Sequence, residues 1–164
     1  MTFFFFGTLM DRDVLTAVLD RPVSEGEIHQ AWLHGYRRVR AATASYPVLV
    51  PAPGLVVGGV LFHPRNARDD VRIRHFEDEE YVERWLVAQL PGARLAARVF
   101  FSLETLGCTD DAWNLAEWAH QHKATFLEQC RAWMRDCPAC DFDALADWSG
   151  AAKVAAGGWA PPKK

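Results

Sequence analysis

The sequence predicts an α+β protein built on a small, strongly curved mixed sheet or barrel. Strand patterns dominate the first hundred residues and a helical pattern dominates the rest, which favours α+β over a doubly wound sheet. Glycines recur inside the strand segments, where a curved sheet needs residues without side chains. The chain has 164 residues and is 50% hydrophobic, which is enough for one domain with its own core.

The first element is an apolar segment, "TFFFFGTLM", at residues 2–10. A membrane-spanning helix needs about twenty apolar residues, so this segment is too short to be one. It also lacks the basic start and the cleavage site of a secretion signal. We therefore expect a buried strand over residues 2–6 that ends at Gly7. A helix over residues 11–19 should follow, because two acidic residues stand in its first turn.

The middle of the chain reads as strands with one helical connection. Gly35, Gly58 and Gly59 interrupt the strand patterns, and "PAPG" and "PGA" predict turns. The expected strands cover residues 27–40, 46–50, 55–64, 80–90 and 94–103, and the helical connection covers residues 66–75.

The last third of the chain predicts a long amphipathic helix over residues 110–137, or two helices with a break. Its apolar stripe has three- and four-residue spacing, with Asp110 and Asp111 in place for the N-cap and first turn. Tryptophans at helical spacing are expected to pack this helix onto the barrel. The predicted organisation is a barrel domain at residues 1–105, a helical extension at 106–149 and a flexible tail at 150–164.

Composition narrows the possible partners and compartment. The formal net charge is −3, so no basic surface points to nucleic acid or to anionic membranes. Four cysteines lie in the last third of the chain and no secretion signal precedes them. Such cysteines are typical of reduced thiols or metal ligands in a cytoplasmic protein.

Three segments, in this order and spacing, resemble one family. They are "FFGTLMDRDVL", "YPVLVPAPG" with "VVGGVLF", and "FEDEEYVER". Together they are similar to the gamma-glutamylcyclotransferase-like family, also known by the name of a plant avirulence-induced gene. The resemblance covers roughly residues 3–103, and "WNLAEWAHQHKATFL" is similar to the tails of bacterial members.

The resemblance implies a barrel of the gamma-glutamylcyclotransferase type and a reaction. The enzyme would cyclise a γ-glutamyl amide to 5-oxoproline and release the free amine, with Glu77 as general base and then acid. It implies a small-molecule γ-glutamyl substrate, no metal and no organic cofactor. The oligomeric state stays open between monomer and homodimer, because the tryptophan-rich helix could pack inward or form a dimer seam. The substrate-binding residues carried over to this chain are Phe6, Gly7, Thr8, Leu9, Tyr46 and Tyr81.

The residues support this chemistry on their own terms. A glycine between a strand and a helix lets the backbone approach a ligand, and the amides of Gly7, Thr8 and Leu9 would form an anion cradle. Glu77 follows Phe76 in an acidic run, where partial burial and like charges would raise its pKa towards neutrality. The alternative interpretation of this run is a solvated acidic turn. We interpret its other members, Asp78, Glu79 and Glu80, as surface residues.

The chain departs from the family pattern at several positions. Phe6 replaces the loop tyrosine, and Asp78 replaces the glycine that follows the catalytic glutamate. Ile73 and Arg74 stand for a Leu-Asp pair, and the last strand carries phenylalanine, at position 100 or 101, in place of tyrosine. These departures favour the main alternative function, a non-catalytic module that binds a small acid or a partner.

Two other groups of residues carry weaker hypotheses. Cys137 and Cys140 have the spacing of redox dithiols and zinc knuckles, with Cys130, His120 or His122 as further ligands. Cys130 and Cys137 also lie on the apolar stripe, which predicts a core position. The arginines Arg37, Arg38 and Arg40 alternate on a predicted strand, where they form a solvated face or meet a substrate carboxylate.

Overall fold

The computed structural model describes residues 2–77, 81–102 and 107–138. Within these ranges the chain forms six strands, three α-helices and three short 3₁₀ turns. The strands are β1 (Phe3–Phe5), β2 (Ile28–Ala41), β3 (Pro47–Phe62), β4 (Tyr81–Leu90), β5 (Ala93–Ser102) and β6 (Cys108–Ala112). The helices are α1 (Arg12–Leu19), α2 (Ala67–Glu77) and α3 (Leu115–Trp133), and the turns are η1 (Thr8–Met10), η2 (Glu25–Glu27) and η4 (Met134–Asp136).

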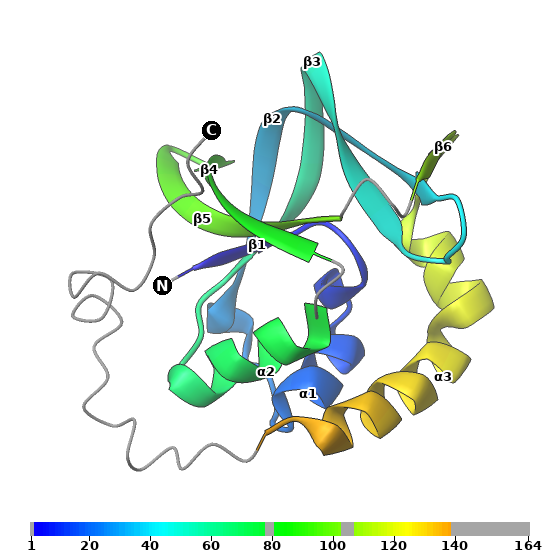
Figure 1. Cartoon of the computed structure of the whole chain (residues 1–164). Helices are drawn as coiled ribbons and strands as arrows, with labels where there is room; N and C mark the ends of the chain where they lie inside the picture. The colour runs from blue at the N-terminus through cyan, green and yellow to red at the C-terminus, as the bar shows by residue number, and fades with distance from the viewer. Residues whose placement is uncertain (1, 78–80, 103–106, 139–164) are drawn as a thin grey trace, which may run out of the picture.

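Five of the strands close into a barrel. The sheet order is β3-β1-β5-β4-β2-β6, and an additional pairing between β3 and β2 closes the ring. β1 runs parallel to β5, whereas its pairing with β3 and the pairings β2–β3, β2–β4 and β4–β5 are antiparallel. The helices lie along one side of the barrel (Figure 1). The predicted mixed α+β barrel is thereby confirmed.

One long strand, β3, replaces the two extended segments expected around "PAPG". Its register against β2 shifts between His34 and Tyr36, so that residues 52–55 lie opposite Gly35 alone. Gly35 and Gly54 have φ angles of 83° and 85°, which favour glycine at this irregularity. Pro51 and Pro53 therefore do not end the strand, because the bulge accommodates them and β3 bends sharply there (Figure 1).

The buried residues form two main clusters, one on each side of the β1 strand. Alternate phenylalanines of β1 point to opposite faces, as the two-residue period of a strand requires. Phe4 joins the cluster inside the barrel with Leu33, Leu61 and Phe101. Phe3 and Phe5 join the second cluster, in which the barrel packs against α1, α2 and α3. Both faces of β1 are thus apolar because both are buried.

The start of the last helix differs from the prediction. α3 begins at Leu115, and its N-cap is Asn114, whose side chain accepts from the amides of Ala116 and Glu117. Asp110 and Asp111, expected in the cap and the first turn, lie instead in β6. Strand pairing overrides the capping signal, because β6 pairs with the edge of β2 and carries the sheet beyond residue 105. The predicted domain boundary at that residue stays a prediction.

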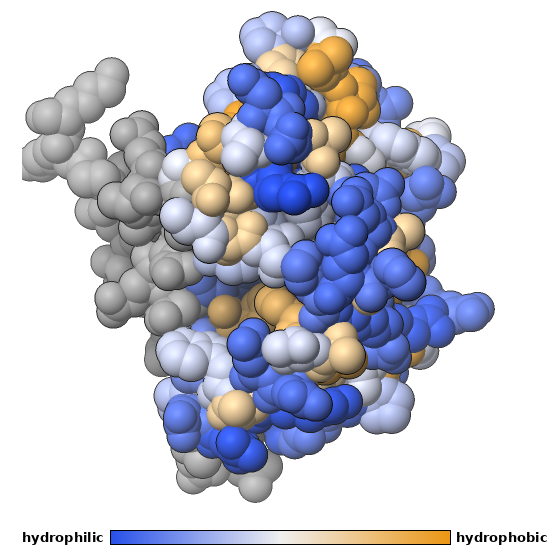
Figure 2. Space-filling view, turned by 90° about the vertical axis from the view of Figure 1, so that its right-hand side faces the viewer, coloured by the Kyte–Doolittle hydropathy of each residue, from blue (hydrophilic) through white to orange (hydrophobic). Residues whose placement is uncertain are grey.

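Helix α3 packs on the rest of the molecule through aromatic residues, as the tryptophan spacing suggested. Trp113 and Trp118 are buried, with ring centroids 6.1 Å apart. Trp133 is 43% exposed, and Trp148 lies outside the described residues. The side of the molecule that carries α3 is mostly hydrophilic on its outside, with apolar colour gathered near the top (Figure 2). Trp118 and Cys130 are the buried residues of α3, whereas Trp133 keeps part of its ring exposed.

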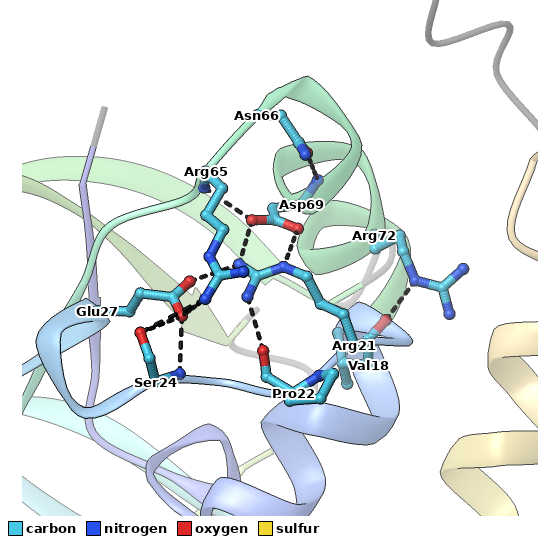
Figure 3. A network of polar contacts seen from close by, with 9 residues as sticks. All are labelled: Val18, Arg21, Pro22, Ser24, Glu27, Arg65, Asn66, Asp69 and Arg72. Carbon is cyan, nitrogen blue, oxygen red and sulfur yellow. Dashed lines mark hydrogen bonds and ion pairs between the residues drawn. The ribbon is translucent and has the colours of Figure 1, made fainter.

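The start of α2 is held by four charged residues and one serine, which we call the ionic clasp (Arg21, Ser24, Glu27, Arg65 and Asp69). Arg21 donates to both Asp69 oxygens, at 3.0 and 2.5 Å, and to Glu27 at 2.7 Å (Figure 3). Glu27 also accepts from Arg65 at 2.6 Å and from the Ser24 amide and hydroxyl at 2.8 Å. The clasp joins the segment after α1 to η2 and to the first turn of α2.

A second buried pair holds the middle of α2 against the barrel. Asp70 of α2 pairs with Arg98 of β5, whose side chain is 1% exposed and stacks over the Phe3 ring at 4.1 Å. Arg74 bridges Asp70 and Glu83, at 3.0 Å from each. Charge pairs thus fix α2 along its length, and its last residue is Glu77.

Candidate active site

All seven residues predicted for the site line one pocket of about 330 Å³. The volume is within the range of small-molecule sites. The pocket lies where β1 and the loop after it meet the start of β3, the end of α2 and the inner face of α3. The predicted residues in its wall are Phe6, Gly7, Thr8, Leu9, Tyr46, Glu77 and Tyr81.

The loop after β1 presents its backbone at the pocket. The Gly7 and Thr8 carbonyls accept from the amides of Met10 and Asp11, at 3.0 and 2.9 Å, which closes η1. A Cβ on Gly7 would lie 3.0 Å from the Pro47 ring, so a side chain here would push against that ring and glycine fits without such a shift. Within the described part of the chain, no hydrogen bond uses the amide of Gly7, Thr8 or Leu9 as donor. Within the described residues these three donors have no acceptor, as a backbone anion cradle requires.

Arg38 holds this loop from outside the pocket. Its guanidinium donates to the Phe6 carbonyl at 2.7 Å and to the Met10 sulfur at 3.7 Å, and it stacks over Trp113 at 5.1 Å. Burial lowers the pKa of Arg38 from its ordinary value. The Phe6 carbonyl and the Gly7 N–H belong to one peptide unit and point in opposite directions. The hydrogen bond from Arg38 to the Phe6 carbonyl therefore also sets the direction of the Gly7 N–H.

The other two arginines of β2 meet acidic residues near the surface. Arg37 pairs with Asp110 at 2.9 Å, and Arg40 lies 3.9 Å from Glu117. These two residues fit the interpretation as a solvated strand face, whereas Arg38 is half-buried and contacts the loop.

Glu77 supplies the carboxyl group of the pocket. It is the last residue of α2 and follows Phe76, whose ring packs edge-on against Phe126 at 6.2 Å. Burial raises the pKa of Glu77 from 4.5 to about 8. The carboxyl group is therefore largely protonated at neutral pH and exchanges its proton near that pH. Asp78, Glu79 and Glu80, which were predicted to be surface residues, lie outside the described residues.

Two tyrosines stand near the loop and Glu77. Tyr46 precedes β3 and Tyr81 is the first residue of β4, and their ring centroids are 6.4 Å apart. Both line the pocket. They bring phenolic hydroxyl groups to a wall that is otherwise largely aromatic and aliphatic.

Helix α3 forms a wall of the pocket that sequence reasoning did not assign to the site. It contributes Phe126, Gln129, Cys130 and Trp133. Trp133 stacks on His75 of α2 at 5.4 Å and donates through Nε1 to the His75 carbonyl at 3.1 Å. Three of these residues belong to the apolar stripe of the helix, which predicted that they would be buried. The sequence pattern alone does not show that part of this stripe faces a cavity.

Comparison with known proteins shows the family of this chain. The sequence model of the family described as gamma-glutamyl cyclotransferase, AIG2-like, matches residues 3–120. The chain belongs to this family. No curated protein matches the chain.

Solved structures with this family's fold are similar to the chain. A solution structure of At5g39720.1 from Arabidopsis thaliana is 24% identical, with a TM-score of 0.56 over 82% of this chain and 90% of that one. At3g28950.1 from the same plant is 20% identical, with a TM-score of 0.56 over 82% and 84%. A structure titled gamma-glutamyl cyclotransferase is 11% identical, with a TM-score of 0.50 over 80% and 86%. At these identities the likeness shows the fold alone.

The cysteines of the thiol or zinc hypothesis lie in different surroundings. Cys130 is buried in the wall, as its place on the stripe predicted, and burial raises the pKa of its thiol to about 11. Cys137 is half-buried, and Cys140 lies outside the described residues. Across residues 2–77, 81–102 and 107–138, no group of three metal-binding side chains is present. In the same ranges no helix is long and apolar enough to cross a membrane.

Proposed function

We propose that this protein cyclises a γ-glutamyl amide to 5-oxoproline and releases the free amine. The observation that carries the proposal is the position of Glu77 in one pocket with three unused loop amides. The family match over residues 3–120 supports a cyclotransferase-type enzyme. Fold and family alone do not specify a reaction, so the proposal rests on the pocket residues.

Glu77 serves first as base and then as acid. Its carboxylate takes a proton from the α-ammonium of the glutamyl group, and the freed amine attacks the γ-carbonyl of the same group. The new C–N bond closes the five-membered ring, and the C–N bond to the leaving amine breaks as Glu77 returns its proton to that amine. The ring nitrogen loses a second proton as it becomes the lactam N–H, and this proton passes to solvent or to the released amine, which leaves as an ammonium. The nucleophile is tethered, so the enzyme needs little entropic help. A pKa of about 8 suits a group that must both accept and donate near neutral pH.

The loop amides supply the complementary charge stabilisation. The N–H groups of Gly7, Thr8 and Leu9 bind the oxyanion of the tetrahedral intermediate or the substrate carboxylate. Phe6 lines the pocket at the position where the family pattern has tyrosine. The missing hydroxyl does not alter the backbone, so the loop amides keep their places. Tyr46 and Tyr81 complete the substrate-binding set. Proton transfer and amide donors account for every step, so the reaction calls for no metal or organic cofactor.

A non-catalytic binding module remains the second candidate, because Phe6 stands where the family pattern has tyrosine. In that function the same amides would hold a small acid without turnover. The cytoplasmic location and the choice between monomer and homodimer stay predictions from the sequence.

The test is release of 5-oxoproline from a panel of γ-glutamyl amides by the wild type and by Glu77→Gln. The substitution keeps the size and removes the proton shuttle, so the rate should fall at least ~10²-fold. Glu128→Gln, at an exposed position of α3, is the matched control and should keep the wild-type rate. Equal turnover by wild type and Glu77→Gln contradicts the proposed role. Binding without turnover on any substrate supports the binding module.

A further inference from the structure

The pocket wall divides into two chemically different groups. Gly7, Tyr46, Pro47 and Tyr81 form the first group, in which Pro47 lies against Gly7 and the two tyrosine rings are 6.4 Å apart. This group contains the loop backbone and two phenolic hydroxyls. We call it the polar group.

The second group comes from α3 and the end of α2. It consists of Phe76, Phe126, Gln129, Cys130 and Trp133. Phe126 contacts both Phe76 and Trp118, and Trp133 is fixed by its stack on His75. We call this group the apolar group. Its aromatic rings have defined positions, so it is a preformed surface that a ligand can cover.

Charged side chains are scarce among the lining residues that the structure describes. Glu77 is the one carboxylic acid among them, and none of them is a lysine, an arginine or a histidine. Glu77 directly follows Phe76 of the apolar group in the chain. A carboxylate end placed on the apolar group would lose water without meeting a cation among these residues, and an ammonium end would meet only Glu77, which the proposed reaction uses.

We infer that the leaving amine is an uncharged, apolar one that packs on the apolar group, with the glutamyl end held by the polar group. This inference rests on the proposed function, because it divides one γ-glutamyl amide between the two groups. Amines that carry a distant carboxylate or ammonium, such as amino acids and polyamines, are disfavoured. Covering Phe126 and Trp133 removes apolar surface from water, whereas a charged end opposes that burial.

The experiment compares three γ-glutamyl amides of similar length that differ at the far end of the amine. The amines are hexylamine, which is apolar, aminocaproic acid, which ends in a carboxylate, and hexamethylenediamine, which ends in an ammonium. The hexylamide should have a kcat/KM for 5-oxoproline release at least about tenfold above both charged amides. Equal or higher values for a charged amide would overturn the inference.

A variant of the apolar group sharpens the test. Gln129 lines the pocket from an exposed position on α3, so a charged residue there leaves the core untouched. Gln129→Lys should raise the kcat/KM of the carboxylate-ended amide relative to the hexylamide by about twofold to fivefold. Gln121→Lys is the matched control, since Gln121 is exposed on the same helix and lies outside this pocket. Equal shifts in both variants, or none in Gln129→Lys, contradict contact between the amine and α3.

A binding measurement distinguishes failure of the proposed reaction from failure of the inference about the leaving amine. Titration calorimetry of the three amides with Glu77→Gln measures affinity without turnover. Tighter binding of the hexylamide, with no 5-oxoproline from the wild type, supports the apolar subsite and rejects the reaction. Equal binding of all three amides overturns the subsite, whatever the wild-type turnover.

Discussion

Two buried or half-buried glutamates, Glu27 and Glu77, lie near opposite ends of α2 and have opposite acid strengths. Burial alone would raise the pKa of Glu27, but hydrogen bonds from Arg21, Ser24 and Arg65 outweigh it and lower the pKa to about 2. Removal from water is the cause that acts on Glu77, and it raises the pKa of this carboxyl group to about 8. The same side chain is therefore a permanent anion in the ionic clasp and a titratable acid in the pocket.

The difference shows how the fold separates stability from chemistry. The ionic clasp uses carboxylates whose charges are always paired, and so it can hold α2 in place. Among the described residues of the pocket wall, Glu77 has no cation beside it, and removal from water makes its anion less stable and ready to accept a proton. The ion pairs of Asp69 and Asp70 anchor α2, so the helix does not depend on an ion pair of Glu77 with any described residue.

The largest expected effect comes from breaking the clasp. Asp69→Asn removes the negative charge that pairs with the Arg21 guanidinium. The Asp69 side chain is 1% exposed. Loss of one partner from a buried pair should lower the free energy of unfolding by about 3 kcal/mol or more, measured by urea denaturation. Asp20→Asn is the control, because Asp20 is 67% exposed in its pair with Arg68 and should cost less than about 1 kcal/mol. Similar losses in both variants would show that the clasp does not anchor α2.

The pH dependence of stability tests the other half of the comparison. Between pH 4.5 and about 8 the folded state holds a proton on Glu77 that the unfolded state releases, so stability falls as pH rises through this window. Glu77→Gln should therefore raise the unfolding free energy at pH 9, on the order of 2 kcal/mol after allowance for partial exposure, and change little at pH 4.

Glu27 should behave in the opposite way. Its folded pKa lies below the unfolded value, so its contribution is present above pH 4.5 and is lost as pH falls through about 2. The penalty of Glu27→Gln should accordingly shrink as the pH falls from 4.5 to about 2, whereas the gain from Glu77→Gln should shrink as the pH falls from about 8 to 4.5 and be absent below that. Thermal unfolding of both variants across this pH range gives the two profiles. Parallel profiles would mean that the two carboxyl groups do not differ as described.

The smallest expected effect concerns the loop amides. Arg38→Met keeps a long apolar stem over Trp113 and removes the bond to the Phe6 carbonyl. The proposed cyclisation should lose about tenfold in kcat, equivalent to about 1.4 kcal/mol, because the Gly7 amide is then less well oriented. Arg37→Met, on the adjacent exposed position, should keep the wild-type rate. A fall in stability without a fall in kcat would make Arg38 a purely structural residue.

The sequence by itself determined the fold class and the identity of most pocket residues. The apolar β1 strand, the glycine after it and the acidic run after Phe76 are local signals, and each predicts what lies next to it in the chain. Residues 7–9 and Glu77 could be named from these signals, whereas Phe6, Tyr46 and Tyr81 were named from the family resemblance. The structure brings all of them to one pocket.

The tertiary structure alone decided how those residues are supported and what surrounds them. Asp110 and Asp111 have the local signature of a helix start, yet pairing with β2 makes them strand residues. The apolar stripe of α3 predicts burial, but only the packing of that helix shows that Phe126, Cys130 and Trp133 border a cavity.

The same limit applies to charge. The clasp joins Arg21 and Asp69, which are 48 residues apart, and no local pattern predicts such a pair. Acid strength depends on partners that meet only after folding, so the sequence could propose a raised pKa for Glu77 but could not distinguish it from Glu27. Sequence names the reactive groups, and the long-range contacts of the folded chain determine which of them keep their protons.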